Sequence, residues 1–237
     1  MATGKLYLIP TPLGPDGDHV IPEYALEIAR RLTVFVLEKG KVGRQVLKQY
    51  QISTPLRECR FFELNKFTDA KDIPGFLTPA LEEGLDIGLL SDAGAPGVAD
   101  PGAEVVMAAH RKGIEVVPLV GPSSILLALM ACGMNGQRFT FHGYLSPKRP
   151  QLAKDLKRLE RDSQQRKETQ LFIEAPYRNM AVLETALGCL STSTMLCVAT
   201  DLTLTTQYIK TQTVARWRKQ PLPDLHKRPT IFLVFRL

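Results

Sequence analysis

Residues 89–102 read Leu-Leu-Ser-Asp-Ala-Gly-Ala-Pro-Gly-Val-Ala-Asp-Pro-Gly. The apolar run 87–90 predicts a buried strand, and the loop after it holds three glycines, two prolines and two aspartates. Prolines stiffen such a loop, and glycines let its backbone approach a partner closely. Asp92 and Asp100 can accept hydrogen bonds from nearby backbone amides. The pattern indicates a shaped loop at the end of a buried strand.

The length of this loop also favours a function. A helix is predicted only at 103–111, whereas connections in α/β units usually have about two to six residues. Open α/β sheets bind ligands at the carboxyl ends of their strands, which is where this loop begins. The alternative is an ordinary strand-to-helix connection. We interpret the loop as a ligand-binding loop.

Strand-like and helix-like patterns alternate on both sides of the loop. This rhythm predicts a mostly parallel sheet with helices on both faces. The predicted strands are 6–9, 33–37, 87–90 and 115–119, and the predicted helices are 22–32, 42–50, 74–83 and 103–111.

The second half begins after a turn at Pro118–Pro122 and changes in style. The runs 208–212 and 230–235 are joined by a short connection around Trp217, which favours an antiparallel pair and hence a mixed sheet. We therefore expect an α/β protein with two domains, residues 1–118 and 119–237. The other predicted elements of the second domain are helices 123–132, 148–167 and 180–190 and strands 139–142, 171–174 and 195–200.

Composition narrows the classes of protein further. The chain has 237 residues, a net charge of +6 and four scattered cysteines without a C-x-x-C pair. Scattered cysteines and dispersed histidines argue against a metal site or a disulfide framework. No apolar stretch reaches the ~20 residues of a membrane span, and the amino terminus does not look like a signal peptide. We expect a cytoplasmic protein without a metal or a membrane segment.

Several well-known site motifs do not occur in the sequence. It contains no G-x-x-x-x-G-K-[ST] loop, no G-x-G-x-x-G and no G-x-S-x-G. Nucleoside triphosphate hydrolysis, a Rossmann dinucleotide site and an α/β-hydrolase elbow therefore lose support.

The loop resembles a known family. Ser-Asp-Ala-Gly-Ala-Pro at 91–96, followed by Asp-Pro-Gly at 100–102, is similar to the signature loop of the tetrapyrrole methylase superfamily, whose members use S-adenosylmethionine (SAM). Three further segments resemble the branch that methylates a cytidine ribose 2′-hydroxyl in small-subunit ribosomal RNA. They are Gly-Lys-Leu-Tyr-Leu-Ile-Pro-Thr-Pro-Leu-Gly at 4–14, Val-Pro-Leu-Val-Gly-Pro-Ser-Ser at 117–124 and Glu-Ala-Pro-Tyr-Arg at 174–178.

The resemblance implies a specific architecture and set of partners. It implies two α/β domains, the first with a parallel and the second with a mixed sheet, and a SAM cleft between them. It also implies a homodimer, with ribosomal RNA or the small ribosomal subunit as a partner. The residues expected to bind SAM are Pro10, Ser91, Asp92, Ala93, Gly94, Pro96, Val98, Asp100, Gly121, Pro122, Ser123, Ser124, Tyr144, Glu174, Ala175, Pro176, Ala199, Asp201 and Leu202.

Methyl transfer to a ribose hydroxyl would benefit from a base near the attacking oxygen. Glu38 and Glu63 are the candidates, because each stands at or near the end of a strand-like run. A salt-bridged or capping role is the alternative for each. Lys39, Lys41 and Lys66 lie near these two acids, at positions where we expect the acceptor.

Basic residues concentrate in the predicted helix 148–167 and in a second cluster at 216–228. Phosphate contacts with RNA are one interpretation of the helix, and a solvated face with interspersed acids is the other.

Two functions besides RNA methylation stay open at this point. One is a methylase of a small, tetrapyrrole-like molecule. The other is a SAM-binding or RNA-binding protein that has lost catalysis. Methyl transfer from labelled SAM to ribosomal and tetrapyrrole acceptors would distinguish them.

Overall fold

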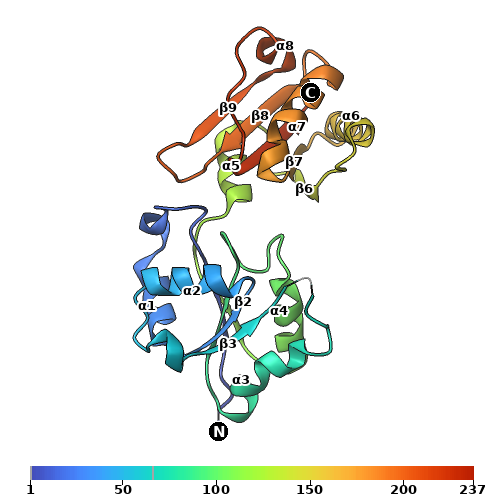
Figure 1. The fold of residues 1–237 in the computed structure, drawn as a ribbon. Helices are drawn as coiled ribbons and strands as arrows, with labels where there is room; N and C mark the ends of the chain where they lie inside the picture. The colour runs from blue at the N-terminus through green and yellow to red at the C-terminus, as the bar shows by residue number, and fades with distance from the viewer. Residues whose placement is uncertain (1, 66) are drawn as a thin grey trace. The chain divides into compact units, whose positions relative to one another are not determined.

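The computed structural model describes residues 2–65 and 67–237. The chain divides into two compact units, and the boundary between them along the sequence lies between Ser123 and Ser124. The boundary expected from the sequence, 118/119, lies in the turn that precedes this point. Each unit contains its own five-stranded sheet (Figure 1).

All strand pairs in the sheet of the first unit are parallel, which confirms the predicted sheet type. The strand order is β3-β2-β4-β1-β5. The strands are β1 (Leu6–Ile9), β2 (Val34–Leu37), β3 (Arg60–Glu63), β4 (Ile87–Leu90) and β5 (Val116–Pro118). The helices are η1 (Asp18–Val20), α1 (Glu23–Arg31), α2 (Gly40–Gln49), η2 (Leu56–Glu58), η3 (Ile73–Leu77), α3 (Thr78–Glu82) and α4 (Gly102–Arg111).

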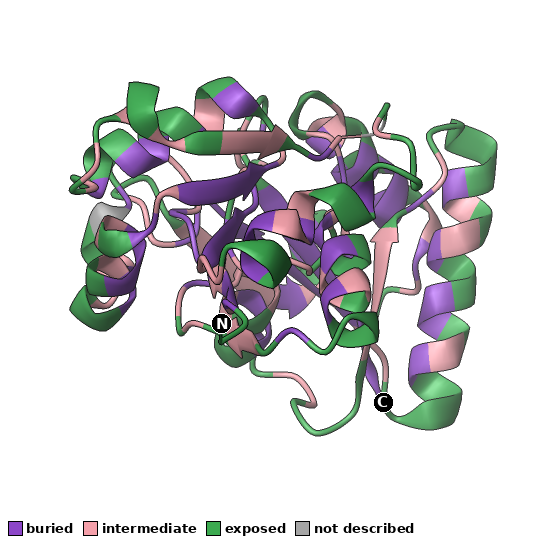
Figure 2. Ribbon diagram, turned by 90° about the horizontal axis from the view of Figure 1, so that it is seen from below, coloured by how far each residue is buried: buried purple, intermediate pink, exposed green. Residues whose placement is uncertain are grey.

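Alternating side chains of the first sheet enter two separate cores. Phe35 and Leu37 of β2 pack into the core that includes α1 and α2. Val34 and Val36 of the same strand pack into the core that includes α3 and α4. Both faces are therefore covered, which explains why the central strands are apolar throughout. Figure 2 shows the buried strands in purple and the exposed outer faces of the helices in green.

The order of strands places a topological switch point between β1 and β4. From β1 the chain proceeds to β2 on one side, and from β4 it proceeds to β5 on the other. Open α/β sheets bind ligands in the crevice at such a point, beyond the carboxyl ends of the strands. In this unit the crevice is flanked by the residues that follow β1 and β4.

The second unit has a mixed sheet, as predicted, in the order β6-β7-β10-β8-β9. Strands β6 and β7 are parallel, and every other neighbouring pair is antiparallel. The strands are β6 (Phe139–Tyr144), β7 (Thr169–Ile173), β8 (Met195–Thr200), β9 (Tyr208–Thr213) and β10 (Thr230–Phe235). The helices are α5 (Ser124–Cys132), α6 (Arg149–Arg166), η4 (Pro176–Arg178), α7 (Asn179–Cys189) and α8 (Val214–Trp217).

The predicted antiparallel pairing of 208–212 with 230–235 is wrong. Strand β8 lies between β9 and β10 and pairs antiparallel with both, so β9 and β10 run parallel to each other. Burial explains the order. Strand β10, Thr-Ile-Phe-Leu-Val-Phe, is almost entirely buried and takes a central place, whereas the more polar β9 is partly exposed at the edge.

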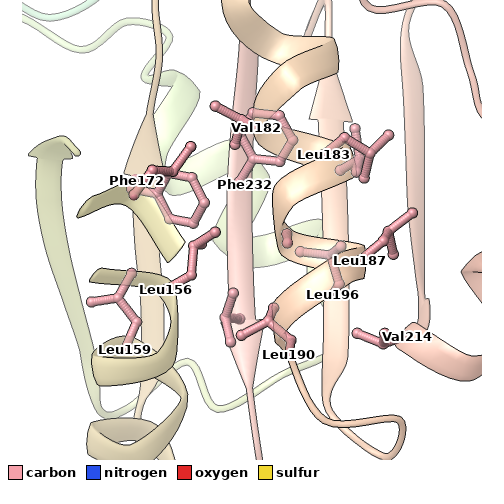
Figure 3. Close-up of a cluster of buried hydrophobic side chains, with 14 of the residues drawn as sticks. Leu156, Leu159, Phe172, Val182, Leu183, Leu187, Leu190, Leu196, Val214 and Phe232 are labelled. Carbon is pink, nitrogen blue, oxygen red and sulfur yellow. The ribbon is translucent and has the colours of Figure 1, made fainter. Parts of the chain in front are cut away.

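The core of the second unit lies between the sheet and helices α6 and α7 (Figure 3). Phe172 of β7 and Phe232 of β10 stack with their ring centroids 5.3 Å apart. The Trp217 side chain is fully buried, and its Nε1 donates to the carbonyl of Leu196 at 2.9 Å. This bond fixes α8 to β8, the strand next to the edge strand β9.

Candidate functional site at the carboxyl edge of the first sheet

The five parallel strands of the first unit deliver their following residues to one edge of the sheet. Strands β1 and β4, which flank the switch point, are followed by Pro10 and Ser91. Neighbouring strand ends bring Glu38 and Glu63 to the same edge, since Leu37 pairs with both Leu90 and Glu63. The sequence-predicted loop and both proposed bases therefore lie at one edge.

Backbone hydrogen bonds join the loop after β1 to the loop after β4. The amide of Thr11 donates to the carbonyl of Gly94 at 2.9 Å, and the amide of Gly94 donates to the carbonyl of Thr11 at 3.1 Å. The hydroxyls of Thr11 and Ser91 also donate to the carbonyl of Gly94, each at 3.4 Å. These bonds span the switch point and fix both loops.

At two glycines of this region there is no room for a side chain. Gly94 has a φ of +80°, where a side chain is strained, and an added Cβ would lie 3.1 Å from Leu13 Cδ2. A Cβ on Gly121 would lie only 2.0 Å from Pro10 Cβ. Pro10 itself is held, because its carbonyl accepts a 2.7 Å hydrogen bond from the buried Tyr50 hydroxyl. Gly94 is therefore required by its positive φ, and Gly121 by its contact with the Pro10 ring.

Asp100 organises the end of the loop. Its carboxylate accepts hydrogen bonds from the amides of Gly97 at 3.0 Å and Gly102 at 2.6 Å. Burial raises the pKa of Asp100, while these two amides oppose the rise. The predicted bonding to local amides is confirmed for Asp100, whereas the Asp92 carboxylate forms an ion pair with Lys39.

Glu38 lines a small pocket whose walls are mostly apolar. Its Oε2 accepts a 3.1 Å hydrogen bond from the amide of Asp92. Burial raises the pKa of Glu38, the hydrogen bond from Asp92 lowers it, and the nearby Asp92 and Asp100 charges raise it. The pocket has a volume of about 180 Å³, with solvent at its mouth included. It is lined by Glu38, Leu64, Leu89, Leu90, Ser91, Pro96, Asp100, Pro101 and Gly102.

Glu63 has different surroundings. Its side chain is half exposed, and its carboxylate lies 3.9 Å from the Arg44 guanidinium. A Cβ on Gly40 would lie 1.9 Å from Glu63 Oε1, so this carboxylate rests against the start of α2. Lys41 is exposed on the first turn of α2. Lys66 lies outside the described residues.

The remaining predicted positions of this loop region differ in exposure. Pro96 and Pro122 are buried, Val98 is 50% exposed, and Ala93 is exposed. Ser123 ends the first unit, so the turn that contains Gly121 belongs to it. The predicted residues of this unit thus form one group around the switch point, with Val98 exposed in the same loop.

The other predicted positions belong to the second unit, where all of them except Ser124 lie at or near one edge of its sheet. Strands β6, β7 and β8 run in the same direction, so Tyr144, Glu174 and Asp201 follow or end them on one side of that sheet. The amide of Lys227 donates to the carbonyl of Pro176 at 3.2 Å, and this links the segment before β10 to the segment after β7. Ala199 and Leu202 are buried beside Asp201, Ala175 is partly buried, and Ser124 begins α5.

Buried charge distinguishes this second edge. Asp201 Oδ2 accepts from Arg228 Nε and from the Thr206 hydroxyl, each at 2.8 Å. Asp201 and Thr203 have φ values of 49° and 73°, which are unusual for residues with side chains. The sequence reasoning did not assign Arg228 a role in this site. Its only signal was membership of a basic cluster.

Glu174 is nearly fully buried at the same edge. Its Oε1 accepts a 2.8 Å bond from the amide of Ala175, and Arg178 lies 3.5 Å from Oε2. Neither Glu174 Oε2 nor Asn179 Oδ1 has a hydrogen-bond partner among the described residues. Sequence reasoning missed Asn179, which begins α7 directly after the quoted Glu-Ala-Pro-Tyr-Arg segment.

Two absences apply to the described part of the chain. It contains no group of three histidines, cysteines, aspartates or glutamates placed to hold a metal ion. Within the same residues, no helix combines the length and the apolar character needed to cross a membrane.

Comparison with known proteins gives the following relationships. The sequence profile described as "Tetrapyrrole (Corrin/Porphyrin) Methylases" matches residues 5–216. A relative from Synechocystis, "Ribosomal RNA small subunit methyltransferase I", is 34% identical over 203 residues, which cover 84% of this chain and 67% of the relative.

Solved structures share the fold at lower sequence identity. The methyltransferase CobJ superimposes with a TM-score of 0.63 and 18% identity, and the match covers 99% of this chain and 95% of that protein. Uroporphyrin-III C-methyltransferase from Thermus thermophilus, solved in complex with S-adenosylhomocysteine, gives a TM-score of 0.55 at 15% identity, and 98% of each chain is covered. The fold predicted from the sequence is confirmed.

Proposed function

Because the chain belongs to the tetrapyrrole methylase family, a family of SAM-dependent methyltransferases, we propose that its acceptor is small-subunit ribosomal RNA, at the ribose 2′-hydroxyl of a cytidine. The observation that carries the proposal is the 34% identity to a ribosomal RNA small subunit methyltransferase I across most of the chain. Acting on ribosomal RNA would place the protein in the cytoplasm.

The first unit has the features that a SAM site needs. Gly94 and Gly121 pack directly against Leu13 and Pro10, so the loops after β1, β4 and β5 lie close together without side chains at these two positions. Backbone amides and carbonyls can recognise the polar atoms of an adenosine or an amino acid without bulk. The bonds across the switch point keep these groups fixed. We propose that the residues of the loops after β1, β4 and β5 bind the donor.

SAM, when bound, supplies a methyl group already activated by the sulfonium. The chain must then position the acceptor hydroxyl, exclude water and receive a proton. The loop after β4 is suited to positioning, because Asp92 is held near its start and Asp100 near its end. The roles of Tyr144, Glu174–Pro176 and Ala199–Leu202 toward the donor stay predictions.

The outer face of α6 supports contact with a polyanion. Lys154, Lys157, Arg158 and Arg161 are exposed and recur at intervals of three to four residues, so they form one stripe of the helix. Arg158 is paired with Asp162 at 3.5 Å, an interaction that solvent and salt weaken. We propose that this α6 stripe contacts RNA phosphates.

We also propose that two copies of the chain associate. Helix α5 contains no charged residue, yet Leu126 and Met130, one turn apart, are 53% and 78% exposed. A helix that is apolar all round is normally covered. Sedimentation equilibrium tests the proposal, and a monomer at micromolar concentration would contradict it.

The function is tested by offering acceptors side by side with labelled SAM. We expect label in purified small ribosomal subunits or free ribosomal RNA, and mass spectrometry should place it on a cytidine ribose. Label in a tetrapyrrole alone would favour the small-molecule alternative. Binding of S-adenosylhomocysteine without transfer to any acceptor would indicate a protein that has lost catalysis.

A further inference from the structure

Two consecutive residues hold the same loop residue by different groups. Glu38 Oε2 accepts the hydrogen bond of the Asp92 amide at 3.1 Å, and Lys39 forms an ion pair with the Asp92 carboxylate. Both holding residues directly follow β2, and Asp92 lies two residues after β4. The main chain and the side chain of one residue are therefore fixed at the same time.

The position of this contact matters for the loop after β4. Strands β2 and β4 are neighbours with Leu37 opposite Leu90, so the contact joins two adjacent strand ends. Asp92 directly follows Ser91 and precedes Gly94, the residue bonded to Thr11 on the other side of the switch point. The loop is thus attached to β2 at its first residues and to the β1 loop two residues later.

We propose that Glu38 and Lys39 form a clamp on Asp92, and that Glu38 is a positioning residue for the donor loop instead of the base of the reaction. The proposal rests on the proposed function. The clamp fixes the position of the segment 91–94, and this segment borders the space assigned to SAM. A carboxylate whose oxygen already holds a backbone amide acts through that loop.

The charges around Glu38 agree with this role. Lys39 and the two acids Asp92 and Asp100 face the same region, and Asp100 is held by the amides of Gly97 and Gly102. Lys39 offsets the repulsion between Glu38 and Asp92. A hydrogen bond between an ionised carboxylate and a backbone amide is stronger than a neutral one, so its loss should be measurable.

Two substitutions at position 38 distinguish a role of Glu38 in the clamp from a role as the base. Glu38→Ala removes the acceptor for the Asp92 amide, whereas Glu38→Gln keeps a carbonyl oxygen that can accept it but cannot take up a proton. The clamp predicts that Glu38→Ala weakens S-adenosylhomocysteine binding about tenfold, and that Glu38→Gln recovers most of this loss. Glu27→Ala and Glu27→Gln on the exposed face of α1 are matched controls.

Amide hydrogen exchange of Asp92, followed by NMR, gives a readout that is independent of activity. We expect faster exchange in Glu38→Ala, near wild-type exchange in Glu38→Gln, and a smaller increase in Lys39→Met. Unchanged exchange in Glu38→Ala would overturn the clamp, even if methyl transfer failed for another reason. Failure of the wild type to bind S-adenosylhomocysteine would instead overturn the proposed function.

Steady-state kinetics with the RNA acceptor provide a second way to distinguish a clamp from a base. If Glu38 is the base, Glu38→Gln should lose kcat by about a hundredfold or more with S-adenosylhomocysteine affinity kept, and the acidic limb of the pH profile should vanish. The clamp predicts that Glu38→Gln keeps that limb and changes kcat by less than about fivefold. Loss of kcat together with normal Asp92 exchange would overturn the positioning role.

Discussion

The carboxyl edges of the two sheets are built in contrasting ways. At the edge of the first sheet, backbone groups of Thr11 and Gly94 bond to each other, and Gly121 leaves no room for a Cβ. At the edge of the second sheet, buried side-chain charges are paired, as in Asp201 with Arg228. The first edge is therefore sensitive to added volume, and the second to lost charge.

The contrast extends to hydrogen bonding. At the first edge, backbone amides bond to the carbonyls of Thr11 and Gly94 and to the carboxylate of Asp100, whereas the second edge retains buried acceptor oxygens on Glu174 and Asn179 without hydrogen-bond partners among the described residues. Unpartnered buried acceptors are costly, which makes them informative about donors that the chain does not itself supply. The two edges should therefore respond differently to the same kind of substitution.

The largest expected effect comes from breaking the charge pair of the second edge. Arg228→Met leaves the Asp201 carboxylate, 8% exposed, without its cation, and we expect the free energy of unfolding to fall by about 3 kcal/mol. The fluorescence of Trp217, the only tryptophan, reports unfolding of this unit in a denaturant titration. Arg216→Met, at an exposed position of α8, is the control, and an equal loss in both variants would contradict the role of the pair.

The second-largest effect is expected from added side-chain volume at the carboxyl edge of the first sheet. A Cβ at Gly121 must displace Pro10 by more than an ångström, and we expect Gly121→Ala to lower S-adenosylhomocysteine affinity about hundredfold. Isothermal titration calorimetry measures this affinity. Gly75→Ala is the matched control, because a Cβ there meets nothing within 4 Å. Wild-type affinity in Gly121→Ala would show that the turn is not part of the donor site.

Most of the fold could be predicted from the sequence, because it follows from local patterns. The apolar runs at β1, β2 and β4 and the helices between them are visible as alternating hydrophobic segments. The place of β10 could not be predicted, because the order of strands depends on competition for burial across the whole sheet. Its central position follows from pairing with both β7 and β8.

The candidate site was predictable where it depends on residue type and not where it depends on contacts. Glycines and prolines indicated the loop after β4, since their backbone preferences are local. The partners of Asp92 and Asp201 were not visible, because Lys39 and Arg228 are 53 and 27 residues away in the sequence. Side-chain pairs of this kind are set by the tertiary structure.

A smaller effect is expected at Gly94. Its φ of +80° costs a residue with a Cβ about 1–2 kcal/mol, and the added atom would press on Leu13. Gly94→Ala should weaken S-adenosylhomocysteine binding about tenfold by calorimetry. If strain is the cause, Gly94→Asn should bind better than Gly94→Val, because asparagine tolerates positive φ. The reverse order would contradict strain as the cause.

The smallest expected effect concerns the α6 stripe, which tests whether charge in the second unit also serves RNA. Lys154→Gln with Lys157→Gln removes two exposed cations without disturbing the buried side of the helix. We expect RNA affinity to fall about fivefold near 150 mM salt, and the slope of log affinity against log salt to become shallower by about 1.4 to 1.8.

Lys48→Gln with Lys112→Gln, both exposed in the first unit, is the matched control for net charge. An equal change in both double variants would mean that overall charge, and not the stripe, attracts the RNA. An unchanged slope in the α6 variant would show that its lysines do not contact phosphate.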